Sequence, residues 1–120
     1  MRTRLPGADP YVDIHQLDLD VAIYRDRVQV THRATGAFID QRAEYPFSDD
    51  HKLIAEPRFL EDTMVRAIRK IVQQGGFSLR APIAHVIACD GAVDAGDQNA
   101  IRHCLRETGM TDVIFELDLS

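Results

Sequence analysis

The chain has 120 residues, 45% hydrophobic and 28% charged, which is the composition of one globular domain with a core of its own. The formal net charge of −5 argues against nucleic acid as a partner, because a phosphate-binding surface usually carries a basic excess. No apolar run reaches the about 18 residues that a membrane-spanning helix requires, so we expect no transmembrane segment.

The N-terminal part predicts a tail followed by a strand. Residues 1–10 lack the apolar core of a signal peptide, and we expect a flexible tail there. Residues 11–120 then form a single domain. Tyr11–Ile14 indicates the start of a strand, and apolar and polar residues alternate from Leu17 to Ile23, which is the period of a half-buried strand.

Two further strands are predicted before residue 40. After the polar turn Arg25–Arg27, Val28 and Val30 continue the alternation in a returning strand. Thr35–Gly36 marks another turn, and Ala37–Ile39 forms a short strand beyond it. The short connections favour antiparallel pairing, so the sequence predicts a β-meander.

The clearest helix begins at Pro57, a residue that suits a first helical turn, and ends before Gly75. Its apolar residues recur at helical spacing, and basic residues gather near its end. A strand, a second helix and a second strand follow it.

Both of these later strands are apolar. Ile83–Cys89 is an almost continuous apolar run and predicts a strand buried on both faces. A helix over Ala95–Thr108, with Gly109 at its C-terminal cap, leads to the strand Val113–Leu117. Two strands joined through a helix imply a parallel pair, so we predict an α/β fold. The predicted core comprises Val12, Ile14, Leu19, Val21, Ile23, Met64, Ile68, Ile71, Val86, Ile87, Ile101, Leu105, Val113 and Phe115.

This element order is the ribonuclease H-like layout shared by the actin-like ATPases, and short motifs along residues 11–117 resemble the bacterial actin MreB family. The resembling segments are Val12–Ile14, Leu53–Glu56 with the helix after it, Cys89–Val93, Asn99–Arg102 and Thr108–Val113. An actin-like ATPase clasps its nucleotide between two lobes. The resemblance implies the first lobe alone, as an actin-like ATPase subdomain.

The resemblance places Asp13 where the family carries the aspartate that orients metal and water beside the nucleotide. His15 and Gln16 stand in place of the family's Gly-Thr. Backbone N–H groups must approach phosphates closely, and a histidine side chain obstructs that approach. We therefore expect a degenerate phosphate loop, no bound cofactor and no ATPase activity.

Two enzymatic alternatives stay open. Asp13, Glu61 and Asp90 lie roughly where ribonuclease H-like nucleases gather carboxylates around two divalent metals, which need several converging oxygen ligands. With 19 acidic residues in the chain, such a placement also arises easily by chance. The other alternative is an ATPase lobe that a partner chain completes.

The histidines and cysteines suggest structural roles. The five histidines show no metal-ligand spacing, so no metal site is predicted, and His85 is expected to be a satisfied residue facing a neighbouring helix. Cys89 and Cys104 fall at predicted buried positions, which favours inert free thiols and a reducing, cytoplasmic setting.

We therefore expect a non-enzymatic protein-interaction or scaffolding element. A part in bacterial cell-shape determination is implied by the resemblance alone. A lobe with open sheet edges has apolar surface to cover, and self-association as a homodimer, through the helix over Ala95–Thr108 or a sheet edge, is the expected solution.

Overall fold

The computed structural model describes residues 2–3, 12–13 and 16–117, with side chains described from residue 16 onward. The strands and helices are β1 (Arg2–Thr3), β2 (Val12–Asp13), β3 (Gln16–Tyr24), β4 (Arg27–His32), β5 (Phe38–Arg42), α1 (Pro57–Val72), β6 (Ser78–Cys89), α2 (Ala95–Glu107) and β7 (Asp112–Phe115).

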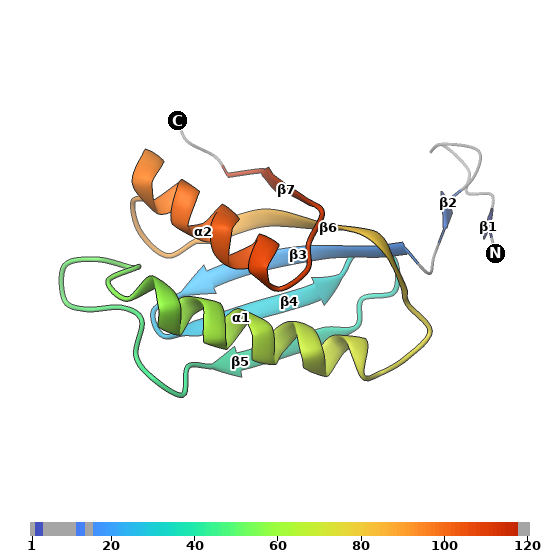
Figure 1. Ribbon diagram of the computed structural model, residues 1–120, viewed down its shortest axis with the longest axis horizontal. Helices are drawn as coiled ribbons and strands as arrows, with labels where there is room; N and C mark the ends of the chain where they lie inside the picture. Colours follow the sequence, from blue (N-terminus) through green and yellow to red (C-terminus); the bar gives the residue numbers. More distant parts are fainter. Residues whose placement is uncertain (1, 4–11, 14–15, 118–120) are drawn as a thin grey trace.

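Five of the strands form one mixed sheet in the order β5-β4-β3-β6-β7 (Figure 1). The β3–β4 and β4–β5 pairs are antiparallel, whereas β6 is parallel to both β3 and β7. This confirms the predicted α/β class and the predicted β-meander followed by two helix–strand units.

The helices end where their sequences predict. Pro57 occupies the first turn of α1, where its missing N–H costs no hydrogen bond, and Arg69 and Lys70 lie in the last turn. A capping box between Asp94 and Asp97 starts α2. Gly109 follows α2 with a φ of +109°, a backbone conformation that L side chains rarely adopt.

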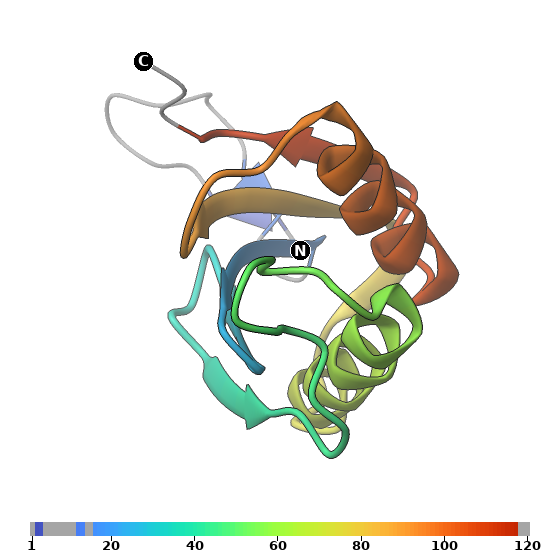
Figure 2. The same cartoon turned by 90° about the vertical axis from the view of Figure 1, so that its left-hand side faces the viewer.

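Both helices lie on the same face of the sheet, so the fold has two layers (Figures 1 and 2). No helix within the described ranges covers the other face, which we call the open face. Strand β6 was predicted to be buried on both faces, and this was wrong, since Ile87 is 42% exposed. A β-bulge explains part of the difference. Val86 pairs with Val21 and Ala88 with Ala22, so Ile87 is left without a register partner on β3.

The first predicted strand also differs. Val12–Asp13 forms β2, which pairs with β1 in a separate two-stranded sheet. The first strand of the main sheet is therefore β3. Ile14, the side chain of Val12 and most of the predicted N-terminal tail lie outside the described residues.

The core lies between the helices and the sheet. Of the predicted core, Leu19, Val21, Ile23, Met64, Ile68, Ile71, Val86, Ile101 and Leu105 are buried, and Val113 and Phe115 are partly buried against the same cluster. Ile87 is the described exception. Three core residues, Phe47, Leu53 and Ile54, come from the loop between β5 and α1, which the apolar periodicity did not reveal.

The neighbours Val86 and Ile87 provide a matched test of these burial assignments. Val86→Ala should lower the free energy of unfolding by roughly 1–3 kcal/mol, because Val86 is fully buried and truncation leaves a cavity. Ile87→Ala should have an effect within about 0.5 kcal/mol, as at other exposed sites. Urea denaturation midpoints measure both, and equal losses would contradict the bulge.

Candidate functional site

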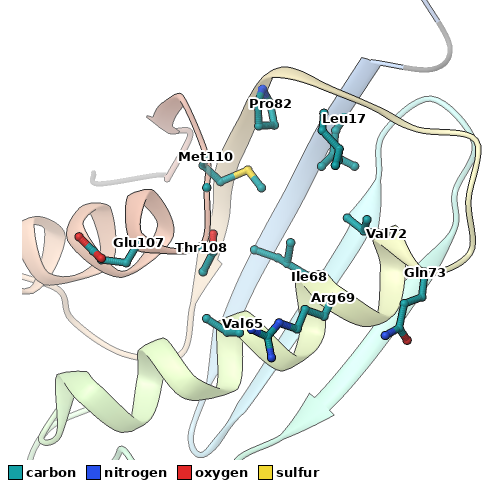
Figure 3. Close-up of a pocket in the computed structure, with 12 residues that line it drawn as sticks. Leu17, Val65, Ile68, Arg69, Val72, Gln73, Pro82, Glu107, Thr108 and Met110 are labelled. Carbon is teal, nitrogen blue, oxygen red and sulfur yellow. The ribbon is translucent and has the colours of Figure 1, made fainter.

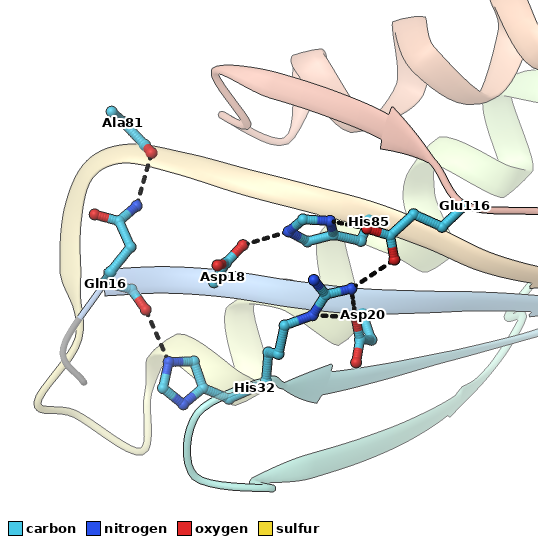
Figure 4. Close-up of polar contacts among 8 residues, drawn as sticks. Gln16, Asp18, Asp20, His32, Ala81, His85 and Glu116 are labelled. Carbon is cyan, nitrogen blue, oxygen red and sulfur yellow. Dashed lines mark hydrogen bonds and ion pairs between the residues drawn. The ribbon is translucent and has the colours of Figure 1, made fainter. Parts of the chain in front are cut away.

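A charged cluster occupies the open face at the centre of the sheet. It comprises Asp18 and Asp20 on β3, Arg33 just after β4, His85 on β6 and Glu116 just after β7, and we call it the open-face network (Figure 4). Asp18 and Asp20 point away from the core because they alternate with buried leucines along β3. His85 reaches the same face, since it lies opposite Asp20 in the sheet register.

Hydrogen bonds and ion pairs join every member of the network. His85 Nε2 lies 2.6 Å from Asp18 Oδ1, and His85 Nδ1 lies 3.0 Å from Glu116 Oε1. The Arg33 guanidinium donates to Glu116 Oε2 at 2.7 Å and to Asp20 Oδ1 at 2.8 Å. Glu116 therefore links the histidine to the arginine, and together the contacts tie four parts of the sheet.

The geometry also fixes what His85 can do. A carboxylate accepts hydrogen bonds, so a ring nitrogen of His85 that carries a proton donates to the carboxylate beside it, Asp18 at Nε2 or Glu116 at Nδ1. With 9% of its side chain exposed and a carboxylate oxygen within 3.0 Å of each ring nitrogen, His85 presents neither nitrogen to a substrate or a metal ion. It is a satisfied structural residue, as predicted, but it faces the open face and not a helix.

A second histidine lies at the edge of this region. His32 is fully buried on β4, with Nδ1 2.7 Å from Thr35 Oγ1 and Nε2 2.9 Å from the Gln16 backbone carbonyl. Its ring packs against Phe77 with centroids 4.5 Å apart. These contacts also indicate a structural role.

The network lowers the pKa of Glu116 below its ordinary value of 4.5, chiefly through the hydrogen bond from Arg33 and then through the one from His85. A carboxyl group whose pKa is lower in the folded state stabilises the fold above its unfolded pKa, and this stability is lost as the pH falls through the folded pKa. The network should therefore weaken on acidification below about pH 4.5.

We expect Glu116→Gln to flatten the acid limb of the stability–pH curve relative to the wild-type protein. Thermal melts at a series of pH values measure this difference. In an Arg33→Gln background the same substitution should change the acid limb less, because the main cause of the lowered pKa is gone. An equal change in both backgrounds would mean that Arg33 does not act on Glu116.

A pocket of about 390 Å³ lies on the opposite side of the sheet, between the last turns of α1 and α2 (Figure 3). Its walls are mostly apolar, with Ile68, Val72 and Met110 among them, while Arg69 and Glu107 also line it. Leu79, another lining residue, is 62% exposed. The pocket is large enough for an apolar group of a ligand.

The three residues of the predicted carboxylate site belong to separate parts of the fold. Asp13 precedes β3 by three residues, a reach of about 10 Å, whereas Asp90 follows the last residue of β6. Since β3 and β6 run parallel for most of the nine residues of β3, or about 30 Å, Asp13 and Asp90 lie toward opposite ends of the pair. Glu61 lies in the second turn of α1. The side chain of Asp13 is outside the described residues.

Of the predicted phosphate-loop residues, the structure describes the side chain of Gln16 alone. Gln16 is the first residue of β3 and not part of a loop, and its amide donates to the Ala81 carbonyl at 2.8 Å. His15 is outside the described residues. The loop that follows the first strand of the main sheet is the tight Arg25–Asp26 turn. The Asp26 carboxylate there accepts a hydrogen bond from the Ser48 backbone N–H at 2.8 Å.

Both thiols are free, and burial makes them poor nucleophiles. Desolvation raises the pKa of Cys89 to about 11 and that of Cys104 to about 12. Within the part of the chain that the structure describes, no group of three or more histidine, cysteine, aspartate or glutamate residues is placed to hold a metal ion. No described helix is long and apolar enough to cross a membrane.

The chain is an α/β domain with a mixed sheet, whose described helices cover one face and whose charged network lies on the other. A scan against protein-family models gives no match, and a search of curated proteins gives no significant match.

Sequence reasoning missed the network, although part of its signal was available. Asp18 and Asp20 stand on the polar side of an alternating strand, and His85 interrupts an apolar run. No local pattern in the sequence predicts the contact between Arg33 and Glu116, because the two residues are 83 positions apart.

Proposed function

We propose that this chain is a non-enzymatic protein-interaction domain that binds a protein partner on its open face. We also propose that the fold is ribonuclease H-like. This rests on the order of the elements, a β-meander followed by two helix–strand units. Its likeness to the first lobe of an MreB-type actin, and a part in bacterial cell shape, rest on the sequence motifs.

One observation carries the proposal. The open face exposes Ile87 at 42% and Ile114 at 43%, on the neighbouring strands β6 and β7, beside the charged open-face network. Exposed apolar side chains next to fixed charges are typical of a protein interface, in which the apolar groups contribute affinity and the charges set orientation.

Capture of partners by the immobilised protein from extracts of its native cells tests the proposal. Ile87→Asp and Ile114→Asp should each reduce the captured partner at least tenfold, since a carboxylate at an apolar contact is left desolvated. Leu79→Asp is the matched control, because this leucine is exposed at the pocket on the helix-covered side. Capture that is lost only with Leu79→Asp would place the interface at the pocket.

Mass spectrometry of the captured fraction then tests the narrower part of the proposal. Proteins of cell-shape control or envelope synthesis, captured by the wild type and lost with Ile114→Asp, would support the cell-shape role. If the captured partner is unrelated to the envelope, the proposal of an interaction domain stands and the proposed cell-shape role is rejected.

The proposal also predicts that the protein binds Mg-ATP no more tightly than about 1 mM. The hydroxyl and glycine of the family's loop are replaced by Gln16 and His15, and the Asp26 carboxylate beside the first hairpin is held by Ser48. Calorimetric titration measures the affinity, with a phosphate-release assay beside it. Micromolar binding, or turnover that Asp13→Ala abolishes, would establish an enzyme instead.

A further inference from the structure

The free edge of β5 has the chemistry of a self-complementary interface. Strand β5 is the outermost strand on its side of the main sheet, and it pairs only with β4 among the described residues. Three of its residues, Phe38, Asp40 and Arg42, have exposed side chains. Phe38 is 50% exposed, which is unusual for so large an apolar group at a strand edge.

The backbone groups that face this edge follow from two hydrogen bonds. His32 N–H donates to the Ala37 carbonyl at 2.7 Å, and Ala43 N–H donates to the Asp26 carbonyl at 2.8 Å. In an antiparallel pair, alternate residues bond to the same neighbour. The odd-numbered residues from 37 to 43 therefore bond to β4, and the backbone groups of Phe38, Asp40 and Arg42 point away from the sheet.

The charges on this edge are unbalanced within one chain. Arg42 lies directly opposite Arg27 in the register, and like charges in that position repel. The carboxylate of Asp40 lies 3.6 Å from Arg27. This carboxylate thus pairs with Arg27 alone, and within the described chain no ion pair involves Arg42.

We infer that β5 pairs with β5 of a second copy of this chain about a two-fold axis at Gln41. Antiparallel pairing of two identical strands in this register sets Asp40 of one copy opposite Arg42 of the other, twice. Both residues have outward-facing backbone groups, so each of these positions forms a hydrogen-bonded pair. The main sheet becomes continuous across both copies.

The residue at the axis supplies an independent observation. Gln41 Oε1 is the one buried side-chain nitrogen or oxygen in the described part of the chain that lacks a hydrogen-bond partner. The amide nitrogen of Gln41 already donates to the neighbouring Arg42 carbonyl at 2.8 Å. In the inferred register the two Gln41 side chains lie opposite each other, so a Gln41 side chain that turns outward from its buried position finds the amide of the second copy as a donor.

Other registers fit less well. With the axis at Asp40, the two aspartates face each other, and like charges directly opposite are unfavourable. An axis midway between two residues pairs even-numbered residues with odd-numbered ones. Backbone groups that face the edge then lie opposite groups that already bond to β4, so the hydrogen-bond pattern is broken. The register centred on Gln41 satisfies both the backbone and the charges.

Charge reversal provides a sharp test by sedimentation velocity. Asp40→Arg and Arg42→Asp should each raise the dimer dissociation constant at least tenfold, because each turns two attractive pairs into repulsive ones. An equimolar mixture of the two variants should associate again, since every contact across the axis is then between opposite charges. The double variant should dimerise within about threefold of the wild type.

Two further variants separate this interface from effects on folding. Asp50→Arg makes the same charge change at an exposed loop position and should leave the dissociation constant unchanged. Asp40→Pro removes an N–H that faces the edge and takes no part in pairing with β4, so it should abolish dimerisation while far-ultraviolet circular dichroism stays native.

A wild type that sediments as a monomer at every concentration would overturn the inference. So would single reversals that dimerise as the wild type does, or a mixture that fails to associate. The inference does not depend on the proposed function. A partner can be captured on the open face, and lost with Ile87→Asp and Ile114→Asp, while the protein sediments as a monomer. Equally, the protein can dimerise through β5 while no partner is captured on the open face.

Discussion

Phe47→Ala should lower the free energy of unfolding by about 3–5 kcal/mol, the largest loss expected from a single truncation in this chain. Phe47 is fully buried and is the largest of the fully buried side chains, although it lies in a loop between β5 and α1. Its ring fills the core, and its carbonyl accepts hydrogen bonds from Ala55 at 2.7 Å and from Glu56 at 3.0 Å.

The loss should lie toward the upper end of this range for a reason that concerns the loop. The Phe47 ring and the two hydrogen bonds fix both ends of the segment that leads into α1. Removal of the ring leaves Leu53 and Ile54 as the buried anchors of this segment, and ordering each residue costs about 1–2 kcal/mol of conformational entropy. Equilibrium denaturation in urea measures the change in unfolding free energy.

Tyr45→Ala is the control for this measurement. Tyr45 lies in the same loop but is 52% exposed, and its ring is 5.3 Å from that of Phe59. Its truncation should cost no more than about 1.5 kcal/mol, the contribution of one aromatic pair. Equal losses at the two positions would mean that the loop is held by its surface contacts and not by the buried ring.

The meander and both helices could be predicted because their signals are local. Along β3 the burial of alternate residues from Leu17 to Ile23 follows a period that any window of the sequence contains. Pro57 and Gly109 mark helix ends through backbone geometry that few other residues share. Such features need no knowledge of the rest of the chain.

The misassignments came where a distant part of the chain decides the outcome. Ile87 has the same local pattern as its buried neighbour Val86, and only the bulge and the uncovered face distinguish them. Phe47 stands in a polar, proline-containing loop without periodicity. Its burial depends on how the loop folds back over the sheet.

The candidate carboxylate site was also grouped from residues that are distant in the sequence. Asp13, Glu61 and Asp90 were grouped by analogy of position, but the parallel register of β3 and β6 sets Asp13 and Asp90 toward different ends. The residues that do meet, Arg33 and Glu116, belong to a turn and a C-terminal segment that carry no common motif. Sheet register therefore decides which polar side chains meet, and short sequence motifs do not contain it.

His85→Ala should cost about 2–3 kcal/mol of unfolding free energy, the second largest loss that we expect. Each of the two hydrogen bonds of the ring to a carboxylate contributes about 1.5–3 kcal/mol when fully buried. Asp18 and Glu116 are 33% and 40% exposed, so solvent screening reduces their combined contribution. Loss of the ring also removes the hydrogen-bond partner that Asp18 and Glu116 share, and leaves three carboxylates around Arg33.

A double-mutant cycle distinguishes this network from simple loss of packing. Asp18→Asn and His85→Ala should together cost less than the sum of the two single losses, with a coupling of at least about 0.5 kcal/mol, because both remove the 2.6 Å contact. His103→Ala, the same substitution at an exposed position on α2, should change stability by less than about 0.5 kcal/mol. Additive losses in the cycle would show that His85 stabilises the fold through its packed ring alone. A coupling energy would show that the contact between Asp18 and His85 ties β3 to β6.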